Sequence, residues 1–308
     1  MSGSRRTVLG AGGAVLTTLV AGCGRPAGGP AVGNNQAGGL ADPGPEGLDP
    51  AVFQKWRDFP VGRTPRPILL IGAPLRETGY HTGDAKLAVA TGRYELAATL
   101  PPGQPASVPV TLPDGTFRLP VISAEQAYKG VRGSGSPGNA PGESPTPLRI
   151  TRVELATAPF DTDRGGLDLP AWLFHAPDSF EPLAWPALRP EAFWRLGDLR
   201  SVGDTFDARL AADGVTLTVT MPAPYPDACP GDPVYRHAPV VLESATAVAV
   251  GIRREVVTIA PGTRSDNCGY DAMLRTRKYT VKLAAPLGPR VLVGAEGGPV
   301  AVVSSARR

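Results

Sequence analysis

Apolar and polar residues alternate in short runs along the second half of the chain, and glycine and proline separate these runs. From Phe206 onward the runs are rich in Val, Ile, Thr and Tyr, and Asp213-Gly214 divides two of them at the spacing of a tight hairpin. Further runs of this kind are PVVLESATAVAVGI, EVVTIA, RKYTVKLAAPLG, RVLVG and EGGPVAVVS. No period repeats strictly, so a propeller or solenoid is not indicated. The pattern predicts antiparallel strands after residue 206.

The first half of the chain mixes helical and strand patterns. PAVFQKWRDFP predicts a short helix or an apolar plug against the core, and RPILLIG predicts a strand over 66–72. KLAVATGRYELAATLP predicts a two-stranded ribbon around Thr91-Gly92, with a helix over 84–90 as the alternative. RPEAFWRLGDL predicts a short helix or a turn.

The clearest helix signal is ISAEQAYKGV. Ser123 can cap the first turn, Gln126 stands three residues later as in a capping box, and Gly130 follows as a stop. We therefore expect a helix that begins after Ser123 and ends at Gly130.

The stretch FDTDRGGLDLPAWLF holds the densest group of carboxylates. A calcium loop starting at Asp161 would need oxygen ligands at its first, third, fifth and twelfth positions, but the fifth is Gly165 and the twelfth is Trp172. Gly165-Gly166 can instead supply the positive φ of a strand reversal, and Pro170 can open the returning strand. We predict a polar hairpin tip whose aspartates are ordinary turn formers and whose returning strand carries aromatic side chains into the core.

Composition favours a mainly β, α+β fold. With 38 Gly and 35 Pro among 308 residues, much of the chain must form turns, loops and short strands. We expect antiparallel sheets with one or two short helices. The chain can fold as one large domain or as two packed β-rich subdomains, an α+β one at 50–195 and one with a disulfide at 196–308.

The N-terminus has the features of a targeting signal. Arg5-Arg6 precedes an uncharged apolar run of roughly 15 residues, too short to span a bilayer but suited to a signal peptide. SRRTVL resembles a twin-arginine export signal, and VAGC resembles a bacterial lipobox, in which the cysteine, here Cys23, is lipidated and becomes the new N-terminus. These resemblances imply a signal peptide at 1–22 and a lipid anchor at the extracytoplasmic face of the cell membrane. A secretory signal that is cleaved elsewhere or retained is the alternative.

The segment after Cys23 holds few large apolar side chains. Such a composition cannot bury enough surface to offset the entropy lost on ordering it. We therefore predict that residues 23–49 consist of a lipidated cysteine and a flexible tether that leads to the folded part.

Two further cysteines, Cys229 and Cys268, predict a disulfide. In an oxidising compartment a pair of thiols is best explained by one structural bridge, here closing a loop of about 40 residues. Metal binding or a nucleophilic thiol is the alternative, but neither cysteine has a C-x-x-C partner or paired histidines.

The net charge of +3 does not indicate nucleic acid. Arg5 and Arg6 lie in the predicted signal peptide, and the rest of the chain has 29 basic and 28 acidic residues. With basic and acidic residues so nearly equal, the chain lacks the surplus of positive charge that is typical of nucleic-acid-binding proteins.

Three histidines, His81, His175 and His237, lie in different predicted segments. No G-x-S-x-G or H-E-x-x-H motif accompanies them, so a hydrolytic site would have to assemble in space. We therefore name no catalytic residue, and we expect neither a metal nor a cofactor.

Acidic residues offer no evident glycosidase pair either. Conceivable members are Asp168, Glu181, Glu243 and Asp271. Glu243 interrupts an apolar strand, where alternation favours an outward side chain. An inward Glu243 would need a cationic partner, for which the candidates are Arg253, Arg254 and Arg275.

Aromatic residues cluster between positions 172 and 194. They could form the main core between a sheet and the segments that cover it, or line a groove for a glycan, peptide or lipid. The groove candidates are Trp172, Phe174, Trp185 and Trp194.

Several segments together resemble one family. PRPILLIG, GDAKLAVATGRYE, ISAEQAY, FDTDRGGLDLPAWLF and KYTVKLAAPLGPRVLVG are similar to segments of twin-arginine-exported lipoproteins from high-GC Gram-positive bacteria, over about residues 65–303. That family has no assigned activity, so the resemblance implies export and a shared fold and no catalytic residues.

The sequence thus favours a lipid-anchored extracytoplasmic protein that binds or interacts and is not an enzyme. Its expected partners are the membrane, through the lipid, and an envelope ligand or protein that the sequence does not identify. A secreted hydrolase with a spatially assembled site and a structural envelope component are the alternatives.

Overall fold

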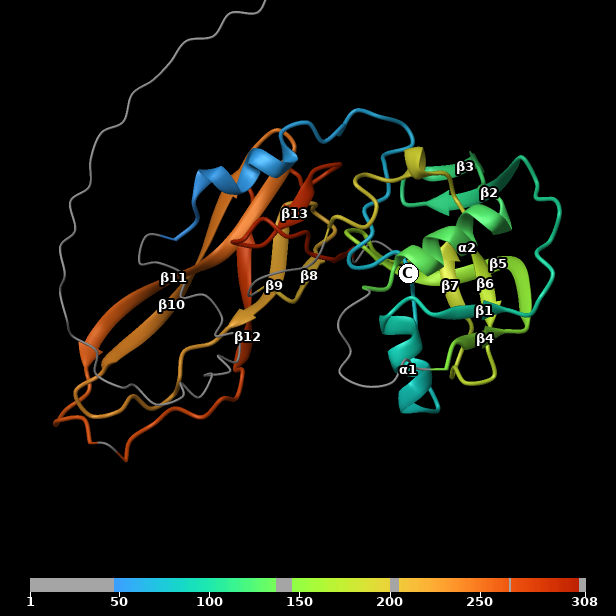
Figure 1. The fold of residues 1–308 in the computed structure, drawn as a ribbon. Coiled ribbons are helices and arrows are strands. Elements are labelled where there is room, and N and C mark those ends of the chain that lie inside the picture. Colours follow the sequence, from blue (N-terminus) through green and yellow to red (C-terminus); the bar gives the residue numbers. More distant parts are fainter. Residues whose placement is uncertain (1–46, 137–145, 200–204, 266, 305–308) are drawn as a thin grey trace, which may run out of the picture. The chain divides into compact units, whose positions relative to one another are not determined.

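The structure is a computed structural model that describes residues 47–136, 146–199, 205–265 and 267–304. These residues belong to one of the two units into which the chain divides, residues 40–308, and the description concerns that unit. Strands make up 42% and helices 12%, and the sheets are small and mostly antiparallel, so the mainly β fold class is confirmed (Figure 1). The predicted export signal, Cys23 and the tether as far as residue 46 lie outside the described residues.

The segment before the first α-helix opens with a 3-10 helix, η1 (Pro50–Trp56). Asp49 Oδ1 accepts a hydrogen bond from the Ala51 backbone N–H at 2.8 Å and so caps its first turn. Trp56 is fully buried, and its indole Nε1 donates to the Gly297 carbonyl at 3.0 Å. Both expectations for this segment, a short helix and an apolar plug, are confirmed.

Residues 66–72 are extended but do not form the predicted strand. Ile68 makes a single bridge to Phe193, and Leu70 makes a single bridge to Thr162. Alternate residues therefore pair with different segments, and no continuous ladder develops. The apolar side chains of Ile68 and Leu70 are nevertheless buried.

The ribbon predicted around Thr91-Gly92 is wrong, and the alternative helix, α1 (Gly83–Ala90), is confirmed. Thr82 caps it, because its Oγ1 accepts a hydrogen bond from the Ala85 N–H at 3.1 Å. Gly92, with φ +70°, turns the chain away after the helix. A good cap and an alanine-rich sequence outweigh the strand pattern here.

Two small pairs of strands follow. β1 (Tyr94–Leu96) pairs in parallel with β4 (Leu148–Ile150), and β2 (Ser107–Leu112) forms an antiparallel hairpin with β3 (Gly115–Pro120). The sequence analysis did not predict this hairpin, whose two turn residues are Pro113 and Asp114 and whose returning strand starts at Gly115, with φ +134°.

Helix α2 (Ala124–Gly133) has the predicted capping box. The Ser123 N–H donates to Gln126 Oε1 at 2.9 Å, and the Gln126 N–H donates to Ser123 Oγ at 3.2 Å. Gly130 does not end the helix. It lies against Trp185, whose ring occupies the place where a Cβ would stand.

An antiparallel sheet of three strands, β5 (Arg152–Thr162), β6 (Gly165–His175) and β7 (Leu183–Pro186), forms the next layer, with β6 in the middle. Trp172 and Phe174 on β6 are 1% and 0% exposed, so the predicted hairpin that carries aromatic side chains into the core is confirmed. The predicted short helix or turn follows β7 as a 3-10 segment, η2, at 190–192.

The predicted Asp213-Gly214 hairpin is confirmed and belongs to a four-stranded sheet. The two strands of the hairpin are β8 (Asp207–Leu210) and β9 (Thr216–Pro222). In the sheet β9 also pairs with β12 (Thr276–Lys282) and β8 with β14 (Val302–Ser304), which gives the order β12-β9-β8-β14. Gly214 has φ +70°, the conformation that a tight turn requires.

The remaining sheet has the order β10-β11-β13. β10 (Pro233–Glu243) and β11 (Ala247–Ile259) are long antiparallel strands, whereas β13 (Val291–Val293) pairs in parallel only with residues 247–249 of β11. Beyond that point, residues 250–259 run beside β10 alone, for about 30 Å at roughly 3.3 Å per residue. We call this part of the two strands the β10–β11 ribbon.

Buried apolar side chains form three clusters. The largest contains residues of β2 to β7, α1 and α2. The second contains side chains from both sheets of the second half, including Met221 of β9 and Val250 of β11. In the third, Trp56 and Phe59 pack with residues of β11 and β13.

Candidate functional site

The tip of the β5–β6 hairpin buries one of its aspartates. Asp163 is 3% exposed, and its Oδ2 accepts a hydrogen bond from Arg66 Nη2 at 2.5 Å. The prediction that the aspartates are ordinary turn formers is therefore wrong for Asp163. Gly165, with φ +81°, begins β6, and Pro170 lies within this strand and does not open it.

The buried ion pair belongs to a small network of four charges. Arg66 Nε donates to the Pro289 carbonyl at 2.7 Å, and the Arg66 backbone N–H donates to Asp114 Oδ2 at 2.8 Å. Asp114 Oδ1 also accepts from Arg164 Nη1 at 3.0 Å. Burial raises the pKa of Asp114, but the hydrogen bonds and the charge of Arg164 lower it by more, so the net pKa lies below the ordinary value. Since two arginines balance two aspartates, the network fits a structural role.

Glu243 takes a partner that the sequence analysis missed. Its Oε2 accepts from Arg290 Nη1 at 2.8 Å, and its Oε1 accepts from the Ala284 N–H at 2.5 Å. Burial raises the pKa of Glu243, and the bonds from Ala284 and Arg290 lower it by more, so the carboxylate form is favoured. Glu243 is thus partly buried and paired, not simply outward as alternation favoured, and its cation is Arg290 and none of the three arginines named as candidates for an inward Glu243.

The other conceivable glycosidase carboxylates are dispersed. Glu181 pairs with Arg76 at 3.2 Å, and Asp271 pairs with Arg275 at 2.6 Å. Asp168 is exposed on β6. Neither of the two hollows described below is lined by any of these four carboxylates.

The three histidines lie in three different environments. His175 Nε2 lies 2.8 Å from Glu154 Oε1, and His237 Nδ1 lies 3.1 Å from the Pro222 carbonyl. The His81 ring packs edge-on against Phe180, with ring centroids 4.7 Å apart. His81 alone of the three lines one of the hollows found in the described part.

The four aromatic groove candidates do not share a groove. Trp172 and Phe174 are core residues, and the Trp172 indole donates to the Ile122 carbonyl at 3.0 Å. Trp185 is partly buried against the same cluster, whereas Trp194 packs in the third cluster against Phe59. Neither hollow of the described residues is lined by any of the four.

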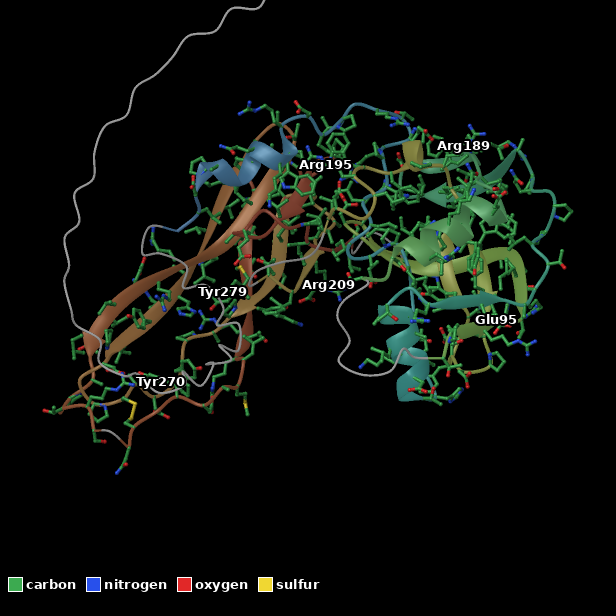
Figure 2. All side chains as sticks on the ribbon, in the orientation of Figure 1. Glu95, Arg189, Arg195, Arg209, Tyr270 and Tyr279 are labelled. Carbon is green, nitrogen blue, oxygen red and sulfur yellow. A yellow bond between two sulfur atoms is a disulfide. The ribbon has the colours of Figure 1, made fainter. Side chains whose placement is uncertain are left out.

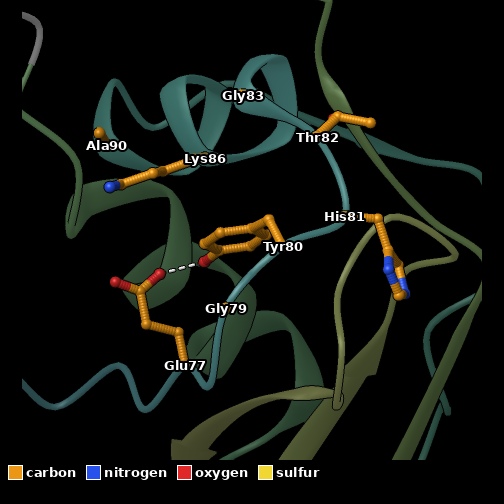
Figure 3. Close-up of a pocket in the computed structure, with 8 residues that line it drawn as sticks. All are labelled: Glu77, Gly79, Tyr80, His81, Thr82, Gly83, Lys86 and Ala90. Carbon is orange, nitrogen blue, oxygen red and sulfur yellow. Dashed lines mark hydrogen bonds between the residues drawn. The ribbon is translucent and has the colours of Figure 1, made fainter.

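An open hollow of about 600 Å³ lies beside the N-terminal end of α1 (Figure 3). Its polar lining groups are Glu77, Tyr80, His81 and Lys86. The Tyr80 hydroxyl donates to Glu77 Oε2, and Figure 3 shows Lys86 on the side of this pair and His81 pointing away from it.

The hollow suits hydrogen bonding better than acid–base chemistry. Burial, followed by the hydrogen bond to Glu77 and its negative charge, raises the pKa of Tyr80 well above the ordinary value. Tyr80 is therefore a neutral hydrogen-bond donor at physiological pH, and its acceptor, Glu77, is already engaged. A second, smaller hollow of about 270 Å³ lies beside η1 and is lined by Phe53 and Arg57 among others.

The far end of the β10–β11 ribbon is tied together by covalent and polar contacts. Cys229 and Cys268 form the predicted disulfide, which is confirmed. Figure 2 shows Tyr270 beside it, and the Tyr270 ring lies 4.7 Å from that of Tyr225. The Tyr270 hydroxyl also donates to Asp232 Oδ2 at 3.0 Å. We call residues 225–232, 254–265 and 267–275 the ribbon end.

The ribbon end exposes most of the large apolar side chains that the described residues leave in solvent. On β11 the exposed fractions are 58% for Val256, 61% for Val257 and 53% for Ile259. A β-bulge opposite Val234 and Tyr235 leaves Val257 without a partner on β10. The full set is Tyr225, Val256, Val257, Ile259, Tyr270, Met273 and Leu274.

The sequence analysis missed this surface because it assigned EVVTIA to a strand and did not ask what covers that strand. The available signal was YDAMLR, in which Met273 and Leu274 follow a cysteine of the disulfide in a segment without strand alternation. Apolar residues in a loop that a disulfide restrains are poorly placed to enter a core.

Comparisons with protein-family models, with curated proteins and with solved structures found no match for this chain. Across the described ranges, no group of three or more His, Cys, Asp or Glu side chains is placed to hold a metal ion. Helices in this part of the chain are also too short or too polar to cross a membrane. The resemblance to exported lipoproteins stays a prediction.

Proposed function

We propose that this protein is a lipid-anchored extracytoplasmic interaction module that makes its contact through the ribbon end. The observation that carries the proposal is that the ribbon end, which holds the Cys229–Cys268 disulfide, exposes seven large apolar side chains. Apolar side chains concentrated in one exposed part of a fold favour a contact with another protein or with a membrane, because exposing them to water is unfavourable.

The disulfide supports the extracytoplasmic location. Bridges of this kind form and persist in oxidising compartments, which agrees with the export signal and lipobox predicted at Arg5-Arg6 and Cys23. A lipid on Cys23 would hold the folded part close to one membrane surface.

A secreted hydrolase is less well supported. That alternative requires a histidine in a hollow beside a serine or a carboxylate. His81 and Glu77 do line one hollow, but the His81 ring faces Phe180 and points away from Glu77, which bonds Tyr80. His175 and His237 are engaged by Glu154 and by a backbone carbonyl.

The test is expression of the full chain and of Cys23→Ser in a bacterium that has twin-arginine export and lipoprotein processing. We expect an acylated N-terminal Cys23 in the membrane fraction by mass spectrometry, and release of the folded part from whole cells by added protease. The Cys23→Ser chain should lose the acyl mass. An unmodified Cys23, or a folded part protected inside the cytoplasm, would contradict the proposal.

A further inference from the structure

The ribbon end itself carries three basic and four acidic residues, and the positive surplus arises when the flanking strand residues Arg236, Arg253, Arg277 and Lys278 are included. The strand ends and loops at 223–237 and 252–278 carry seven basic and five acidic residues. Glu255 is bound by Arg236 at 2.5 Å and by Arg253 at 2.6 Å, so one carboxylate there is shared by two arginines. The formal charge of this region is therefore +2, although the chain after residue 22 is nearly neutral.

Acidic groups at the ribbon end are further covered by arginines. Asp232 pairs with Arg264 at 2.7 Å, and Asp271 pairs with Arg275 at 2.6 Å. Each pair is neutral as a whole, so it neither repels nor attracts an anionic surface, and the net attraction must come from the basic residues outside these pairs. Lys278 and Arg277 lie at the start of β12, where both are exposed.

The mixture of side chains fits the boundary between lipid and water. Val257, Met273 and Leu274 offer aliphatic groups, and Tyr225 and Tyr270 offer rings with a polar tip, the kind of side chain enriched at membrane interfaces. Arginine and lysine around such a group add attraction to anionic headgroups.

The chain enters the described part on the same ribbon. A Cβ built on Gly47 would lie 3.5 Å from Val240 Cγ2 and 4.0 Å from the Cβ of Arg253. From Arg253 to Ile259 the strand covers about 20 Å, whereas the 24 residues from Cys23 to Gly47 span at most roughly 80 Å. A lipid on Cys23 is therefore within reach of the surface that the ribbon end would touch.

We infer that the ribbon end docks on the surface of an anionic phospholipid bilayer, the membrane in which the chain is anchored. The apolar side chains of Val257, Ile259, Met273 and Leu274 enter the interface, and the exposed Arg277 and Lys278 on the flanking strand β12 contact the headgroups. The inference rests on the proposed function only for the anchor that keeps the ribbon end near the bilayer. Docking would orient the folded part against the membrane.

The charge predicts a measurable lipid preference. Each basic residue near an anionic surface contributes about 1 kcal/mol, so a net charge of +2 predicts roughly thirtyfold tighter partitioning onto anionic than onto neutral vesicles. Lys278→Gln should weaken binding to anionic vesicles by about fivefold and leave binding to neutral vesicles unchanged.

The experiment uses the full chain with Cys23→Ser, which removes the acylation site and leaves the disulfide cysteines bridged. An environment-sensitive fluorophore is attached at Met273→Cys, and in a control chain at Leu87→Cys, which is exposed on α1. Vesicles of phosphatidylcholine, with and without about one third phosphatidylglycerol, are added. All chains share the same N-terminal segment, so a difference between the two labelled positions reports on the ribbon end.

We expect a blue shift and a rise in emission at position 273 with anionic vesicles, and little change at position 87. No change at 273, or equal changes at both positions, would overturn the inference. A blue shift that depends on protein concentration without vesicles would also overturn it, in favour of a second copy as the occupant. Acylation of Cys23 is measured separately, so these results can fail while the anchor stands.

Discussion

Gly130 in α2 offers a test of packing with a matched control in the same helix. Replacing a helical glycine by alanine ordinarily stabilises a helix by about 1 kcal/mol, because glycine has more backbone entropy to lose. At Gly130, however, the new Cβ would lie 2.3 Å from Trp185 Cζ2 and 2.5 Å from Cε2. Gly133, three residues later in α2, has nothing within 4 Å of the same atom.

The changes in the free energy of unfolding that the two substitutions cause should therefore have opposite signs. Carbon atoms pack at about 3.5–4.0 Å, so the Trp185 ring would have to move by more than about 1 Å to admit Gly130→Ala. Overpacking of this kind costs about 1–3 kcal/mol. The helix-propensity gain is shared with Gly133→Ala, so the difference between the two variants isolates the clash. We expect Gly130→Ala to be less stable than Gly133→Ala by about 1–3 kcal/mol.

Urea unfolding followed by circular dichroism measures both free energies of unfolding. Trp185→Leu provides a rescue, because removing the ring should make Gly130→Ala less costly in that background than in the parent chain. The packing argument is refuted if Gly130→Ala is as stable as Gly133→Ala, or if Trp185→Leu leaves the cost of Gly130→Ala unchanged.

Two further predictions concern carboxylates. Asp163→Asn leaves the buried Arg66 without its charge partner and should lower the free energy of unfolding by about 3–5 kcal/mol, whereas exposed Asp168→Asn should change it by less than about 0.5 kcal/mol; equal effects in urea unfolding would contradict the buried pair. The hydrogen bond from Arg275 outweighs desolvation and, together with the Met273 N–H and the Arg275 charge, lowers the pKa of Asp271 to about 2. Because the folded-state pKa is lowered, the stability from Asp271 is present above pH 3.8 and is lost as the pH falls toward 2. Carboxyl NMR titration should show this pKa and its return toward 3.8 in Arg275→Gln.

Local chemistry made parts of the fold predictable. The capping box at Ser123 and the Asp-Gly turn at Gly214 fix backbone conformation within a few residues, so the sequence analysis located that helix start and that hairpin. The disulfide followed from there being only two cysteines after residue 23. Turn chemistry also marks the overlooked β2–β3 hairpin, where Pro113 and Asp114 form the turn and Gly115 starts the returning strand.

Long-range contacts were beyond local patterns. Gly130 stays within α2 because Trp185, on a strand far along the chain, packs against it. Asp163 is buried because Arg66 reaches it across 97 residues, and Glu243 pairs with Arg290, 47 residues away. Periodicity does not encode such partners. For the same reason it did not reveal that β11 continues past β13 and leaves apolar residues near Val257 uncovered.

Hydrogen–deuterium exchange of the full Cys23→Ser chain with anionic vesicles tests the membrane contact most directly, since it reports on every described segment at once. We expect slower exchange in peptides that cover 254–259 and 268–275, and unchanged exchange around α1 and its hollow. Neutral vesicles should give weaker protection of the same two peptides. Protection centred on α1, or none at the ribbon end, would contradict the account.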